Sequence, residues 1–290
     1  MTCDGELDLG VSAGINCEVA EGASLGNTDA ARSAFYNIGR VIQKAQYWMP
    51  SNSWLQNTLE VRTNVNATCN ATWGGALNMY RAGNGCGNTG QIQSIIVHEW
   101  GHGMDQNDGG GYDNPSDGYA DVIALFENHE SCIGRGFRPL VQCHGYGDTC
   151  LDCTGVRDVD WDKRTQHTPA TPTGFLDVYC PTGTDPCGME VHCGGYVPAE
   201  AMYDLAVRDL PASGLDAATS WQLAERLFYE SRPGSGGNIY NCTLPDSDCC
   251  SVDTWFHQLR LQDDDDGDLS NGTPHGAAIF AAFDRHDIAC

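Results

Sequence analysis

The chain is short of positive charge. Its 290 residues contain 15 lysines and arginines against 39 aspartates and glutamates, and only Lys44 and Lys163 are lysines. The formal net charge of −24 at pH 7 repels polyanions, so we expect neither nucleic acid nor an anionic membrane surface as a partner. No apolar stretch is long enough to cross a bilayer either, which argues against a transmembrane segment.

Targeting and repeat signals are also missing. No signal peptide begins at Met1, so we expect a mature or excised catalytic region. The sequence shows no internal repeat and no low-complexity linker. With 41% hydrophobic residues, the chain can build a proper core, either as one large domain or as two subdomains that share a cleft.

Cysteine, by contrast, is abundant. Fifteen cysteines in a chain without a membrane span indicate an oxidising compartment in which most thiols form disulfides, so we expect a secreted, extracellular protein. The odd count leaves at least one thiol free or bonded to another chain. The adjacent Cys249 and Cys250 are predicted to have separate partners, because a bridge between neighbours strains disulfide geometry.

Two segments offer an alternative structural metal. Cys143-His144 followed by Cys150 and Cys153 has the appearance of a zinc knuckle, but the surrounding cysteine-rich loop favours disulfides. The acidic run Asp263–Asp266 could bind a structural Ca²⁺. Its spacing does not match an EF-hand loop, and a solvated acidic loop is the favoured interpretation.

The hydrophobic pattern predicts an α+β fold in two parts. Residues 1–108 are expected to hold a mixed sheet, with strands at 59–62, 71–73 and 78–80, and two helices. Residues 109–290 are expected to be mainly helical, with disulfide-tied loops between 130 and 190. The expected helices are one at 30–42 capped by Thr28 or Asp29, one after the turn at 83–87, and later ones at 117–127, 198–210 ending at Pro211, 220–229 capped by Ser220, 254–261 and 277–283.

The stretch Val97-His98-Glu99-Trp100-Gly101-His102 contains an H-E-x-x-H sequence after an apolar run. On a helix, two imidazoles four residues apart lie on one face and can hold a single Zn²⁺. Glu99 would then project beside the metal, where it can deprotonate a water molecule. This is the machinery of a zinc hydrolase, although the pentapeptide also occurs by chance on helices with two surface histidines.

A catalytic zinc needs a third protein ligand and an open position. Asp117 and Asp121 are four residues apart on the next predicted helix and so share one face. We expect Asp117 to bind the metal and Asp121 to orient a ligand histidine. The alternative is that Asp117 only caps that helix.

Four blocks together resemble the thermolysin-like gluzincin metallopeptidases: N-A-T-W at 70–73, H-E-W-G-H at 98–102, D-G-Y-A-D at 117–121 and V-H-C-G-G-Y-V-P-A-E-A-M-Y-D-L at 191–205. The last is most similar to the fungalysin branch. The resemblance spans about residues 28–290, although only these blocks are specific. It implies a two-subdomain zincin fold, zinc-dependent endopeptidase activity on peptides or proteins, and an inhibitory propeptide that is not in this chain.

By position, the resemblance makes His98 and His102 metal ligands and Glu99 the general base that later hands its proton to the leaving amine. His192 matches the histidine that hydrogen-bonds the developing oxyanion, with a histidine of a disulfide-rich loop as the alternative. The segment containing Asn70, Ala71 and Trp73 matches the edge strand that binds substrate. The alternatives are an ordinary edge strand or, since Asn70 also begins a sequon, a glycosylation site.

The sequence departs from the family at two points. Gluzincins use glutamate as the third ligand, whereas Asp117 is one methylene shorter, so the second helix must lie closer or another residue must bind. The carboxylate expected five residues before His192 is replaced by Cys187, for which Asp185 or Glu190 could substitute. A second oxyanion donor could be Tyr112 or Tyr119, although both also suit packing positions.

Other interpretations stay open at this point. A metzincin-type site would take Asp108 as third ligand, with Asp105 in the place of the usual turn glycine and no clear Met-turn at Met189 or Met202. That interpretation leaves the paired aspartates and the His192 segment unexplained. A non-catalytic zinc-containing binding or adhesion module is a further alternative, but such a scaffold has no use for Glu99.

Overall fold

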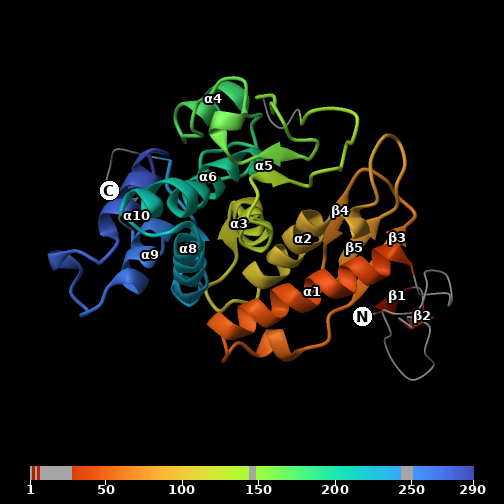
Figure 1. Ribbon diagram of the computed structural model, residues 1–290, viewed down its shortest axis with the longest axis horizontal. Coiled ribbons are helices and arrows are strands. Elements are labelled where there is room, and N and C mark those ends of the chain that lie inside the picture. Colours follow the sequence, from red (N-terminus) through yellow and green to blue (C-terminus); the bar gives the residue numbers. More distant parts are fainter. Residues whose placement is uncertain (1, 4, 7–27, 144–147, 243–250) are drawn as a thin grey trace.

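The longest helix, α1 (Asp29–Trp48), begins where the sequence predicts. The computed structural model describes residues 2–3, 5–6, 28–143, 148–242 and 251–290. Thr28 caps α1, its hydroxyl accepting a hydrogen bond from the backbone N–H of Ala31 at 3.2 Å. Buried positions at helical spacing, such as Ala34, Ile38 and Val41, give α1 an apolar face that packs against α2 (Gln93–Asp105) (Figure 1).

The sheet beside α2 has three strands, β3 (Val61–Val65), β4 (Ala71–Trp73) and β5 (Leu77–Tyr80). Their order is β3-β5-β4, with β5 parallel to β3 and antiparallel to β4. β4 is therefore an edge strand within the described part of the chain, as predicted. β3 begins two residues later than expected. The disulfide Cys69–Cys86 ties the residues just before β4 to the turn that leads to α2.

The other strands are two residues long and pair locally. They are β1 (Thr2–Cys3) with β2 (Gly5–Glu6), β6 (Asp113–Asn114) with β9 (Gly237–Asn238), and β7 (Cys132–Ile133) with β8 (Arg157–Asp158). Short 3₁₀ turns occupy Ser53–Gln56, Thr89–Gln91, Trp161–Lys163, Arg232–Gly234 and Leu269–Asn271. The β7–β8 pair fixes the segment that carries Arg157, a residue of the site.

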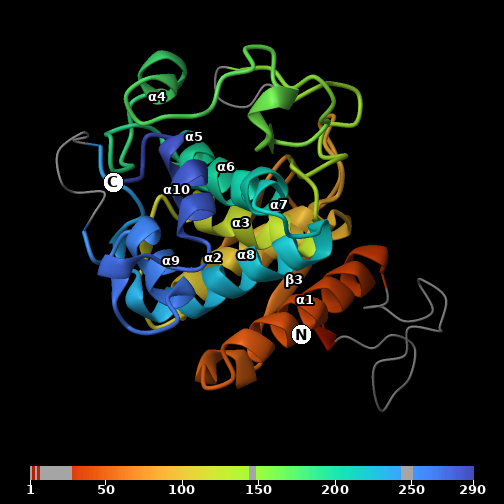
Figure 2. The same cartoon turned by 60° about the vertical axis from the view of Figure 1, so that its left-hand side comes forward.

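The second half of the chain is mainly helical, as expected. Its helices are α3 (Ser116–Asn128), α4 (Phe175–Tyr179), α5 (Val191–Gly194), α6 (Tyr196–Asp204), α7 (Leu210–Ala212), α8 (Ala217–Ser231), α9 (Trp255–Asp263) and α10 (Gly276–Asp284). Figure 2 shows α8, α9 and α10 gathered beside α6 and α3. None of the helices in the described ranges is both long and apolar enough to cross a membrane.

Two predicted helix limits are wrong. The helix through α6 does not stop at Pro211: it continues through a π-helical segment, Leu205–Asp209, into α7, where Pro211 stands in the first turn. Pro211 directly follows the π-helical segment, in which the N–H of Leu210 bonds to the carbonyl of Leu205, so the regular i to i−4 pattern is already interrupted where the proline stands. Ser220 does not cap α8; Asp216 does, accepting from the N–H of Thr219 at 3.0 Å. Aspartate and serine are about equally good N-caps, so residue type alone could not predict which of the two caps the helix.

One hydrophobic core connects both halves of the chain. It extends from Ala34 on α1 through Trp100 and Tyr119 to Phe228 and Ile288. The aromatic rings of Tyr119, Phe228 and Trp255 contact each other edge to face within it. The α+β class is thus confirmed, and the division at residue 108 stays a prediction.

Disulfides tie the loops between the helices. The described pairs are Cys69–Cys86, Cys132–Cys153, Cys143–Cys150, Cys180–Cys193 and Cys187–Cys242, and Cys290 is also disulfide-bonded. The disulfide interpretation of Cys143, Cys150 and Cys153 is therefore confirmed over a zinc knuckle, whose His144 lies outside the described residues. Cys249 and Cys250 lie outside them as well.

Candidate metal centre and substrate cleft

Two helices that cross at a glycine build the centre of the site. α2 carries the H-E-x-x-H sequence, and α3 carries Asp117 and Asp121. At Gly101 an added Cβ would lie 2.8 Å from the Cα of Ala120, so only glycine permits this approach. The close approach answers the question posed by the short Asp117 side chain, because it brings α3 nearer to the histidines.

The three expected ligands lie together. One donor atom each of His98, His102 and Asp117 falls within 4.8 Å of the other two. His98 Nε2 lies 3.6 Å from Asp117 Oδ1. Two imidazole nitrogens and one carboxylate oxygen are the donor set of many catalytic zinc centres, and the small spread of the donors fits a single ion with one position left open.

Both histidines are held through their other ring nitrogen. His98 Nδ1 lies 2.8 Å from Asp121 Oδ1, the contact that the sequence predicts. His102 Nδ1 lies 2.9 Å from the hydroxyl of Ser116, which in turn donates to the buried Asp105 at 2.5 Å. These contacts use Nδ1 and leave Nε2 on each ring for a metal. Ser116 was missed because a serine before a helix normally indicates only a cap.

Arg157 is a second residue that sequence reasoning missed. Its guanidinium donates to Asp121 at 2.5 and 3.1 Å and to Asp117 at 3.0 Å, and it is 4% exposed. Burial, the largest influence, raises the pKa of the Asp117 carboxyl, but the charges of Arg157 and the neighbouring histidines together outweigh it and hold that pKa at about 2. Burial also raises the pKa of Asp121, whereas the charge of Arg157 lowers it, and the net result is a lowered pKa. No local pattern signals this arginine, which the fold brings from a loop-rich segment.

Glu99 lies in the cleft beside the histidines and is 7% exposed. Burial raises its pKa to about 7, partly offset by the charge of His98. The backbone N–H of Trp73 on β4 faces this carboxylate and also lowers its pKa. Because N–H groups of alternate residues point to the same side of a strand, the N–H of Ala71 faces the same open edge.

His192 extends from the short helix α5 toward the same centre. Its Nε2 lies 3.7 Å from Asp117 Oδ1, and its Nδ1 lies 2.5 Å from Glu190 Oε1. Of the two carboxylates considered as its partner, Glu190 therefore makes the contact. Asp185 instead accepts hydrogen bonds from the backbone of Cys187 and from Tyr240.

The two tyrosines considered as oxyanion donors differ in position. Tyr119 is fully buried against Phe228 and Trp255, so its assignment as a donor is wrong. It faces away from the cleft because α3 turns that side into the core. Tyr112 is 54% exposed and lines the cleft.

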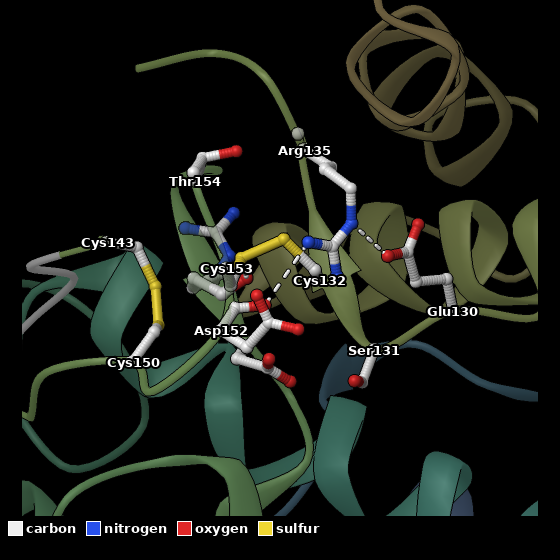
Figure 3. The surroundings of a disulfide bond; sticks show 12 residues. Glu130, Ser131, Cys132, Arg135, Cys143, Cys150, Asp152, Cys153 and Thr154 are labelled. Atoms are coloured by element: carbon white, nitrogen blue, oxygen red, sulfur yellow. Dashed lines mark hydrogen bonds and ion pairs between the residues drawn. A yellow bond between two sulfur atoms is a disulfide. The ribbon is translucent and has the colours of Figure 1, made fainter. Parts of the chain in front are cut away.

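These groups line one cleft of about 590 Å³. One side is the edge strand with its preceding residue, Asn70, and the floor is α2 with Glu99. The opposite wall comes from loop residues held by two disulfides, Cys132–Cys153 and Cys143–Cys150 (Figure 3). The wall residues that line the cleft are Ile133, Phe137, Arg138, Gly155, Val156 and Arg157.

Asp108, the alternative third ligand, lies elsewhere. Its Oδ1 accepts from the N–H of Gly110 at 2.8 Å, and it lines a different hollow with Trp48 and Tyr229. Among the described residues it forms no group with His98 and His102. The geometry thus favours Asp117 over Asp108. The acidic residues Asp264–Asp266 form a mostly exposed loop, and no observation supports calcium there.

The fold links this chain to known proteins. No protein-family model matches the sequence, and no curated protein matches it. Among solved structures, the chain is similar to the precursor of protealysin, a metalloproteinase from Serratia proteamaculans, with a TM-score of 0.61. The alignment has 16% identity and covers 93% of this chain and 81% of the other.

The two chains share a fold. At this identity the likeness extends no further than the fold, so the protein has the α+β architecture of that metalloproteinase precursor. Membership of the gluzincins, and of the fungalysin branch, stays a prediction.

Proposed function

We propose that the protein is a secreted zinc-dependent endopeptidase. The observation that carries the proposal is the meeting, in one cleft, of the His98, His102 and Asp117 donors with Glu99 and an open strand edge. The metalloproteinase fold supports it, and the disulfides are consistent with secretion. The metzincin alternative with Asp108 as ligand loses support because of that residue's position.

His98, His102 and Asp117 would hold the zinc ion. When bound, zinc supplies Lewis-acid polarisation of the scissile carbonyl and makes an attacking water more acidic. Asp121 and Ser116 would keep the two imidazole rings in the required orientation. Arg157 would keep Asp117 and Asp121 charged in a buried setting.

Glu99 would act as the general base and then the general acid. Its buried carboxylate takes a proton from the attacking water and passes it to the leaving amine. A pKa of about 7 suits both steps near neutral pH. The backbone N–H of Trp73 on β4 faces this carboxylate and favours its charged form.

His192 would hydrogen-bond the oxygen that becomes negative as the carbonyl is attacked. Glu190 holds the Nδ1 side of its ring, so Nε2 faces the centre. The substrate would lie extended against β4, pairing with the outward backbone groups of Ala71 and held by Asn70 and Trp73. Such strand pairing suits cleavage inside peptide or protein chains. An inhibitory propeptide is a further proposed partner, because the similar solved chain is a precursor.

The test is Glu99→Gln, which keeps the shape of the side chain and removes its basicity. We expect the variant to bind zinc and remain folded but to lose about 10²- to 10⁴-fold or more in peptide hydrolysis. Glu130→Gln, in the loop after α3, is the matched control and should cleave normally. Full activity of zinc-loaded Glu99→Gln would refute the mechanism. A wild-type protein that binds zinc yet cleaves no peptide would support the non-catalytic binding module.

A further inference from the structure

The cleft contains two arginines in opposite electrostatic situations. Arg157 is buried and neutralised by Asp117 and Asp121. Arg138 is exposed and lines the cleft wall. Across the described ranges, no carboxylate lies within ion-pair distance of its guanidinium. In a chain with a net charge of −24, an unneutralised cation in the substrate cleft is unusual and needs a role.

The backbone under Arg138 is held in place. Its N–H donates to the carbonyl of Thr154 at 2.9 Å, and the carbonyl of Phe137 accepts from Gly87 at 2.9 Å. Thr154 follows Cys153, whose disulfide with Cys132 closes this part of the wall (Figure 3). The backbone that carries Arg138 is thus already ordered, while its guanidinium can still bind a ligand. Less backbone conformational entropy is therefore lost on binding.

Apolar side chains share the cleft with Arg138. Ile95, Ile133, Phe137 and Val156 line the same cleft. When a substrate covers them, water leaves the wall and a charge pair beside it gains strength. The acidic chain as a whole repels an acidic substrate, but this repulsion is screened beyond about 8 Å at physiological salt. The charge of Arg138, which is nearest to a substrate group bound at this wall, therefore decides what binds there.

We propose that Arg138 binds a carboxylate of the substrate and makes the cleft select acidic peptides. A planar guanidinium can take a carboxylate through two parallel hydrogen bonds. The carboxylate can come from an Asp or Glu side chain or from the free end of a short peptide. This inference rests on the proposed peptidase function and names its substrate class.

The experiment uses the full zinc-loaded chain and peptides that differ at one position. A single residue is varied among Glu, Gln and Lys, position by position on both sides of the cleaved bond, in peptides with amidated ends. We expect Glu to exceed Gln by about 5- to 50-fold in kcat/KM at one position. Arg138→Gln should remove this preference, and Arg138→Glu should make Lys the favoured residue.

Arg135→Gln is the matched control. Arg135 lies three residues earlier on the same wall, but its guanidinium contacts Glu130 and the carbonyl of Asp152 (Figure 3). It does not line the cleft. The control should therefore keep the preference of the wild type for acidic peptides.

Each outcome bears on a separate claim. The same peptides are also tested with free carboxyl ends. A rise in kcat/KM that depends only on the free end would identify the chain terminus as the carboxylate that Arg138 binds. Equal cleavage of all peptides by the wild type, or a preference that survives in Arg138→Gln, would overturn the inference. Failure to cleave any peptide would overturn the proposed function first, and this inference with it.

Discussion

Arg157→Met is the substitution that most directly tests how the centre is held. Methionine has a similar length but no charge and no donor. Wild-type Arg157 makes three hydrogen bonds to Asp117 and Asp121, which are 4% and 0% exposed. The variant therefore leaves two buried carboxylates without their cationic partner.

The magnitude follows from the burial of both partners. Removing one partner of a buried ion pair costs about 3–5 kcal/mol. For a chain of this size, each kcal/mol lowers the unfolding temperature by about 2–4 °C, so the zinc-free variant should melt roughly 6–20 °C below the wild type. With zinc bound, the cation replaces part of the lost charge, and the difference should be smaller.

The pH dependence has a definite sign. Burial raises the pKa of Asp117, but the charge of Arg157, together with those of the nearby histidines, outweighs it and holds the pKa at about 2 in the folded protein. The stability that this carboxylate contributes is present above its unfolded pKa of about 3.9 and is lost as pH falls through about 2. Without Arg157, burial is the largest remaining influence and favours protonation. The deficit of the zinc-free variant should thus be largest near neutrality and shrink toward about pH 3.

The assay is thermal unfolding followed by circular dichroism, with and without zinc. Arg226→Met is the control, because the Arg226 side chain is 38% exposed and forms a long ion pair of 3.8 Å with Glu230 on the surface of α8. Its loss should change the unfolding temperature little. An Arg157→Met protein that melts within about 2 °C of the wild type without zinc would refute the reasoning, since it would mean that the pair is not desolvated.

The other predictions concern ligands, catalysis and substrate. Asp117→Ala should lose most of its zinc by metal analysis while Asp108→Ala keeps it; the reverse order would restore the metzincin interpretation. His192→Ala should lower kcat by about 10²- to 10³-fold with zinc content unchanged, and zinc loss would instead make it a ligand. Ala71→Pro removes a backbone donor on the open edge of β4, so peptide turnover should fall while zinc binding and thermal stability hold; unimpaired turnover would contradict strand pairing.

The local patterns of the sequence predicted the parts of the site that lie on single helices. The i, i+4 spacing placed His98 with His102, and Asp117 with Asp121, because spacing on one helix decides which side chains share a face. It could not show that Gly101 lets the two helices approach closely enough for a short aspartate. That depends on contact between helices.

No local pattern could signal Arg157, because its role exists only after a remote loop brings it to Asp117 and Asp121 on α3. Tyr119 was misassigned for a related reason. A tyrosine suits both a cleft and a core, and only the packing against Phe228 shows which side of α3 it occupies. Burial and long-range pairing are therefore the information that local patterns lacked.

The disulfides of the cleft wall have a consequence for self-digestion. The proposed endopeptidase would be surrounded by copies of itself, and loops with little regular structure are the usual places where chains are nicked. The described residues between Cys132 and Cys153 form such a loop, yet a single cut between those two cysteines leaves both fragments covalently joined. β7 begins at Cys132, at one end of this closed loop. β8, which carries Arg157 and pairs with β7, follows Cys153 and lies outside the loop. A nicked molecule would thus retain its cleft wall, and on a denaturing gel the damage would show only after reduction.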